Sequence, residues 1–421
     1  MSLHQPSRQF LAAALVHLSI AGVLISLGPW DQLLTLRWDA LLWLLLVGFV
    51  GFTTIGFALH LFPTISRHLL PVGPLERIAF PVGEAGVIVG TFAAGWPSTW
   101  GIPRWSFSAG AFLYLVSVLI VLSLFVRMIR SPRLKTDEPS IRPGDRASVP
   151  LFIASWIAVV GAGSLFVLSG IAPGPGFGWW LAGVHLFVLG HVVLLVVAVS
   201  LRLVPRSLDA DPPRTVVSTL ATLGVVGSVS VPLGMLLSDP ASPVLLEWLA
   251  LPEAGLAIGL LGLLFFLGLR ARTPRAQLTL HMVGVGFFVI GGGLGLWMLS
   301  QRDYSAVDAH ALVNVVGFLG LTILIMWFGM IAPFQRVSHA WTIRMLWFLS
   351  ALWTVLVIAL AGLGLLAAAP PAWLFGVVGG LFLTVALAWA IGTLPVLYFG
   401  LNPLPGIPSS RIREIRERWR K

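Results

Sequence analysis

The sequence predicts an all-α polytopic membrane protein, a bundle of about twelve transmembrane helices. Three observations support this prediction. The 421 residues are 57% hydrophobic and 10% charged, whereas a soluble domain has about 25% charged residues. Twelve apolar runs are long enough to cross the hydrocarbon core, which takes about 20 helical residues each. Finally, the basic residues between the runs alternate between many and few along the chain.

The apolar runs follow one another with short polar breaks. The break between the seventh and eighth runs rests on the turn-forming sequence DPASP. The runs fall at 9–29, 39–63, 79–98, 105–129, 150–171, 178–203, 214–237, 243–269, 277–300, 309–333, 343–368 and 372–399.

Loop charges predict the orientation in the membrane. The loops after even-numbered runs and the C-terminal tail are rich in Arg and Lys, whereas the opposite loops contain only Arg37, Arg104 and Arg302. Basic loops stay in the cytoplasm, so we expect both termini there and the chain in the cell (inner or plasma) membrane. Residues 1–421 then form one transmembrane domain, with a cytoplasmic loop at 130–149 and a basic tail at 403–421. The net charge of +10 reflects this topology and does not point to a nucleic-acid partner.

The composition excludes several kinds of chemistry. The chain has no cysteine, which excludes disulfides, iron–sulfur clusters and cysteine nucleophiles. Any metal or haem must therefore be held by His, Met or carboxylate side chains. We find no phosphate-binding glycine loop, Ser-His-Asp arrangement or zinc signature.

A pattern in the second, sixth and tenth runs predicts an internal repeat. Each run has a glycine near its start (Gly48, Gly190, Gly317) and ends at a proline 15, 15 and 16 residues later (Pro63, Pro205, Pro333). The prolines lie 142 and 128 residues apart, which is four runs each time. The pattern favours three four-helix arcs around a pseudo-threefold axis, with a chance match of Gly and Pro as the competing explanation.

Ionisable side chains within a membrane are costly, so each is a functional candidate. Four histidines qualify (His17, His185, His191, His310), and two more, His60 and His281, lie near cytoplasmic helix ends. His185 and His310 lie five and seven residues before the glycines of their runs, so we expect similar depths. Imidazole binds haem iron and copper well. The alternative is a neutral histidine hydrogen-bonded to a neighbouring helix.

The surroundings of these histidines narrow the prediction. His310, Asn314 and Gly317 share one helix face, and the glycine leaves room for a flat ligand. His191 follows His185 by six residues, about 240° around a helix. The two cannot point at the same centre, so one of them is expected to be structural.

Two glutamates also lie within apolar runs, in similar sequence contexts. Glu84 occurs in PVGEAGVIVG and Glu253 in LPEAGLAIG. Each is either part of a proton relay or cation site, or a hydrogen-bonded carboxyl that stabilises the bundle.

The topology and two motifs resemble the catalytic subunit of haem–copper oxidases and nitric oxide reductases, especially divergent relatives such as the NnrS family. The motifs are DAHALVNVVGFLGLTI (308–323) and FALHLFPTISR (57–67). The resemblance implies His310 as the proximal ligand of one haem b. Leu312 takes the place of the second histidine of that helix, and the position near Trp43 lacks its partner, so it implies loss of the low-spin haem. The seventh run has no histidine, so it implies no three-histidine copper site.

The resemblance therefore implies a haem-binding membrane protein rather than an oxygen-reducing proton pump. His185 would be a distal ligand or line the distal pocket, and the protein would bind, reduce or sense a small gas such as nitric oxide. Copper is the second cofactor candidate, with His310, His185 and His191 as its candidate ligands. Expected partners are the lipid bilayer, an electron donor and other membrane subunits. The alternatives are a secondary transporter and a non-catalytic partner subunit, and the sequence leaves open whether the protein is an enzyme.

Overall fold

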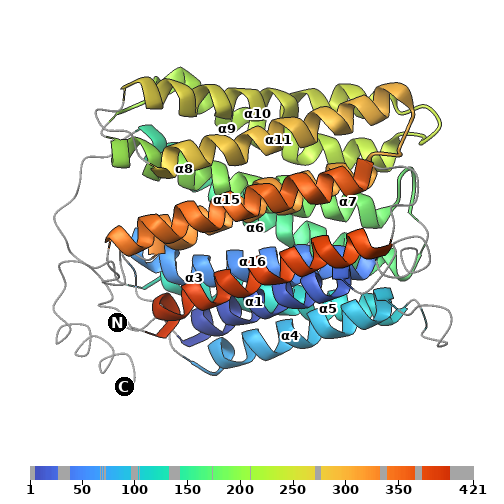
Figure 1. Cartoon of the computed structure of the whole chain (residues 1–421), viewed down its shortest axis with the longest axis horizontal. Helices are drawn as coiled ribbons and strands as arrows, with labels where there is room; N and C mark the ends of the chain where they lie inside the picture. Colours follow the sequence, from blue (N-terminus) through green and yellow to red (C-terminus); the bar gives the residue numbers. More distant parts are fainter. Residues whose placement is uncertain are drawn as a thin grey trace.

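The computed structural model is a bundle of helices that run side by side along its long axis (Figure 1). It describes residues 5–26, 38–66, 68, 70, 73–95, 103, 105–131, 143–172, 174–208, 210–270, 276–331, 339–365 and 372–398. Within these residues there are twelve helices long and apolar enough to cross a membrane, and no named strand. The predicted all-α bundle of twelve spans is therefore confirmed. The predicted tail at 403–421 lies outside the described residues.

Nine spans are single helices that surround the other three. In chain order they are α1 (Gln5–Ser26), α4 (Pro74–Gly95), α5 (Trp105–Ile129), α6 (Pro143–Ser169), α9 (Arg214–Leu237), α10 (Val244–Arg270), α11 (Ala276–Gln301), α15 (His339–Leu365) and α16 (Ala372–Tyr398). In Figure 1, α9, α10 and α11 form one edge of the bundle, and α4 and α5 lie towards the opposite edge.

The second, sixth and tenth spans contain π-helical stretches. The second consists of residues 38–43, η1 (Leu44–Gly51) and α3 (Phe52–Ser66), and the sixth of α7 (Trp179–His185), η2 (Leu186–Val193) and α8 (Leu194–Leu208). The tenth consists of α12 (Val307–Leu312), η3 (Val313–Gly320), α13 (Leu321–Ile325) and η4 (Met326–Ile331). These spans are 100%, 72% and 89% buried, against 50% or less for the other nine.

The π-helical stretches repeat in register. η1, η2 and η3 are each eight residues long, and Gly48, Gly190 and Gly317 are the fifth residue of each. A π-helix is rare and needs specific packing to persist, so three in the same register support the predicted repeat. The repeat helices form the centre of the bundle, and the other spans separate them from lipid.

Among the helix starts, those of α4 and α6 differ most from the predicted positions. α4 begins at Pro74 and α6 at Pro143, five and seven residues before the predicted starts. Residues 143–149, which we assigned to a loop, are therefore helical. Proline suits the first turn of a helix because its missing N–H needs no partner there. Glu76 and Asp145 lie in the first turns of α4 and α6, where their negative charge interacts favourably with the positive end of the helix dipole. The predicted break at DPASP is correct, since α9 ends at Leu237 and α10 begins at Val244.

Candidate functional site

His185 and His310 come together from two different repeat helices. His185 is the last residue of α7, and His310 lies in α12. The centroids of their rings are 6.2 Å apart and the ring planes differ by 18°. Both side chains are half-buried. The similar depth that we predicted from the repeat therefore corresponds to a direct pairing.

Hydrogen bonds fix the same tautomer in both rings. Nδ1 of His310 donates to the carbonyl oxygen of Gly291 in α11 at 2.7 Å, and Nδ1 of His185 donates to the carbonyl oxygen of Leu181 at 2.9 Å. Within the described part of the chain, no hydrogen bond involves Nε2 of either ring. Each Nε2 therefore carries a lone pair. A backbone partner on the other nitrogen is the usual arrangement of a histidine that binds a metal.

Asn314 and a glycine-rich face of α11 support His310. The Asn314 amide donates to the carbonyl oxygen of His310 at 2.9 Å and lies 3.4 Å from its Nδ1. Gly295 faces the ring directly, since a Cβ there would lie 2.9 Å from Cε1 of His310. The absence of side chains at Gly291 and Gly295 lets α11 approach the imidazole closely. Of the three residues predicted to share a face, His310 and Asn314 contact each other. Gly317 instead packs against Phe287 and Val357, which fill the room predicted there for a flat ligand.

His191 has a different environment from His185, although both belong to the sixth span. It is fully buried. Its Nε2 lies 3.1 Å from the Thr54 hydroxyl of α3, and its Nδ1 lies 3.1 Å from the carbonyl oxygen of Ser155 in α6. With both nitrogens hydrogen-bonded, the geometry favours a structural role for this histidine, as a link between three helices.

Two histidines near the predicted cytoplasmic ends lie away from this pairing. His60 is half-buried in α3, and His281 is buried in α11. Within the described residues, no group of three His, Asp or Glu side chains is placed to hold a metal ion.

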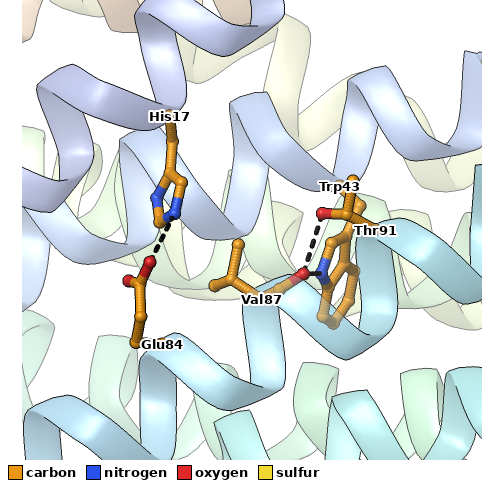
Figure 2. Close-up of polar contacts among 5 residues, drawn as sticks. All are labelled: His17, Trp43, Glu84, Val87 and Thr91. Carbon is orange, nitrogen blue, oxygen red and sulfur yellow. Dashed lines mark hydrogen bonds and ion pairs between the residues drawn. The ribbon is translucent and has the colours of Figure 1, made fainter.

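The two glutamates also differ from each other. Glu84 of α4 pairs with His17 of α1, with 3.2 Å between Oε1 and Nε2 (Figure 2). Sequence reasoning missed this pair, since 67 residues separate the partners. Glu253 of α10 is buried, and neither of its carboxyl oxygens has a hydrogen bond within the described residues. It packs against Gly227 of α9.

Large aromatic side chains occupy the region around Trp43. Trp43 is fully buried. The centroid of its ring lies 4.9 Å from that of Phe107 and 5.5 Å from that of Phe166. Its indole donates to the carbonyl oxygen of Val87 at 3.2 Å, and the Thr91 hydroxyl donates to the same oxygen (Figure 2). Close packing of rings fills the position where the resemblance placed a lost haem ligand.

A solved structure has the same arrangement of helices. It is a haem–copper terminal oxidase dimer determined by cryo-EM, and it matches 95% of this chain and 85% of its own chain with a TM-score of 0.60 at 12% identity. The chain has the fold of a haem–copper oxidase. At this identity the likeness concerns the fold alone. No family model and no curated protein matches the sequence.

Proposed function

We propose that this chain is a membrane haem protein that holds a single haem b between His185 and His310 and binds, reduces or senses nitric oxide or a similar diatomic gas. The observation that carries the proposal is the pairing of the two imidazole rings. The haem–copper oxidase-like fold and the motif around His310 support it. We place the protein in the cell membrane, with both termini in the cytoplasm.

The spacing of the rings fits two ligands of one metal ion. A metal–nitrogen bond is about 2.0–2.1 Å long, which puts the centroid of an imidazole about 3 Å from the metal. The observed centroid separation of 6.2 Å would therefore be short enough for both imidazoles to hold one ion. The two free Nε2 atoms are the donors that such an ion requires.

The residues around the pair have distinct roles in this proposal. Gly291 holds the His310 ring through its carbonyl, and Leu181 does the same for His185. Asn314 fixes the backbone of the helix that bears His310. When bound, the haem would supply one-electron exchange and a site for a diatomic gas. His310 would hold the haem, and His185 would be its second ligand or would line the gas pocket.

An electron donor and further membrane subunits remain proposed partners. The chain has no soluble domain within its described residues that would carry a second cofactor. Electrons would therefore arrive from a separate protein or a reduced molecule in the membrane.

Copper is the second candidate for the same pair, since two imidazole nitrogens at this spacing also suit a copper ion. Haem content and metal analysis separate the two. We expect the purified protein to contain about one haem b per chain by the pyridine haemochrome assay, with a Soret band that His310→Ala abolishes. The matched control is His60→Ala, which should keep the haem.

Other outcomes would replace the proposal. Stoichiometric copper without haem would favour the copper site. Protein purified from haem-replete cells with neither would contradict both, and would move the account to a transporter or a non-catalytic subunit. Substrate-dependent protection of Glu253 from carboxyl reagents would then favour the transporter.

A further inference from the structure

An apolar cavity of about 160 Å³ lies among the three repeat helices, in the halves predicted to be nearer the cytoplasm. Ala58 of α3, Ala198 of α8 and Ile323 of α13 line its interior. None of its lining residues belongs to the His185–His310 site. Most of its lining side chains are apolar, and a cavity with an apolar lining holds apolar groups rather than water.

The exposed lining residues of the cavity indicate that it opens between the end of α5 and the start of α6. Ile129, Val149 and Ile153 line this opening, and they are 56%, 53% and 56% exposed. Exposed apolar side chains on membrane-spanning helices face the hydrocarbon core. Lipid therefore has direct access to the interior of the bundle at this point.

The rim of the opening is basic. Arg202 lines the cavity and its Nε lies 3.6 Å from a carboxylate oxygen of Asp145. Arg130 and Arg146 are exposed, and they lie one and three residues along the chain from the lining residues Ile129 and Val149. The end of the bundle that bears these three arginines and one aspartate is the one predicted to face the cytoplasm, where anionic lipid headgroups are abundant.

We propose that this cavity binds a segment of one acyl chain of an anionic phospholipid, whose phosphate lies at the arginine rim. The occupant must be apolar along its length because the lining is apolar, and it must enter from the bilayer because the opening faces lipid. The excess of arginine at the rim selects a negatively charged headgroup. The bound chain would pack against α3, α8 and α13 together and stabilise the junction of the three repeat helices.

Photo-crosslinking in nanodiscs tests this proposal. The probes are phosphatidylglycerol and phosphatidylcholine, each with a diazirine on one acyl chain, and labelled peptides are mapped by mass spectrometry. We expect phosphatidylglycerol to label α6 and α8 around Ile153 and Val196 at several times the level of other lipid-facing helices. Ala198→Phe, which fills the cavity, should remove this excess, and Arg202→Gln should reduce it for phosphatidylglycerol alone.

Matched controls make either result decisive. Val377→Phe adds the same ring at a lipid-exposed position of α16 that is 59% exposed, and Arg270→Gln removes an exposed arginine at the end of α10. Neither should change the labelling of α6 and α8. Labelling spread evenly over the helices, or a cavity signal that survives Ala198→Phe in folded protein, would contradict the acyl-chain site. Equal labelling by phosphatidylcholine would contradict the anionic headgroup.

Discussion

The same side chain has three different environments in this membrane interior. His191 has hydrogen bonds at both nitrogens, and His17 shares one with a carboxyl group. His185 and His310 each use Nδ1 for a backbone carbonyl and keep Nε2 free. These two rings are paired and each keeps a nitrogen lone pair, as a metal ligand requires, so the partners of each ring, rather than its presence in the membrane, indicate what it does.

His191→Ala should destabilise the fold and leave the haem site intact. The change removes the link to Thr54 and Ser155 and opens a cavity in the core, which together cost about 2–5 kcal/mol. We expect a lower midpoint of thermal unfolding in detergent and a haem content per folded chain equal to that of the unchanged protein. Loss of haem from folded His191→Ala protein would assign this histidine to the cofactor instead.

The stability contributed by the pair of His17 and Glu84 should depend on whether the residue that replaces Glu84 can form a hydrogen bond. Glu84→Ala leaves the buried His17 ring without its hydrogen-bond partner and should cost about 1–3 kcal/mol. Glu84→Gln keeps a hydrogen-bonding group in place and should cost less. Thermal unfolding of the two variants measures the difference. Equal midpoints would show that this contact contributes nothing to stability.

At the scale of elements, the π-helical stretches explain why glycine recurs in the repeat. Each stretch brings its glycine against a neighbour: Gly48 faces the ring of His17, Gly190 faces Ala158, and Gly317 faces Phe287. A wide turn displaces the helix surface, and glycine allows the displaced surface to touch the next helix. The repeat detected in the sequence is therefore a repeat of packing at the centre of the bundle.

Gly190→Ala should destabilise the bundle because its Cβ would lie 2.7 Å from the Cβ of Ala158. Two side-chain carbons at that distance must move apart, and a well-packed core resists this by about 1–3 kcal/mol. The matched control is Gly262→Ala in α10, where a Cβ meets nothing within 4 Å and should be neutral or stabilise the helix by up to about 1 kcal/mol. Thermal unfolding that ranks the two variants in the opposite order would contradict this packing.

Much of the fold could be predicted because hydropathy gives the length and order of membrane spans, and loop charge gives their direction. The depth of His185 and His310 followed from the repeat. The rotation of each helix about its own axis could not be predicted from the sequence, and this rotation decides which neighbour a side chain contacts. The partners His17–Glu84 and His191–Thr54, 67 and 137 residues apart, depend on that rotation.

At the scale of the whole molecule, twelve spans return the chain to the side of the membrane on which it began. The orientation is testable because the natural chain has no cysteine. We expect a single cysteine at the exposed Asp303 position to react with a membrane-impermeant maleimide in intact cells, and one at the exposed Arg130 position to react only after permeabilisation. The unchanged protein is the unlabelled control. The reverse pattern would invert the predicted topology.

The whole-molecule comparison also separates fold from function. The helices follow a haem–copper oxidase fold, yet large side chains pack around Trp43, and the described residues of the seventh span, α9, contain no histidine. A fold can keep its architecture while its sites change. The chemistry we propose therefore depends on one pair of histidines rather than on the fold.

The central claim is that His185 and His310 together would hold one haem b. Electron paramagnetic resonance of the oxidised protein tests it most directly. Two imidazole ligands predict a low-spin ferric signal, which His185→Ala should convert to a high-spin signal with haem still bound, while His310→Ala removes the haem. A protein without haem iron, or a spin state that His185→Ala leaves unchanged, would contradict the account.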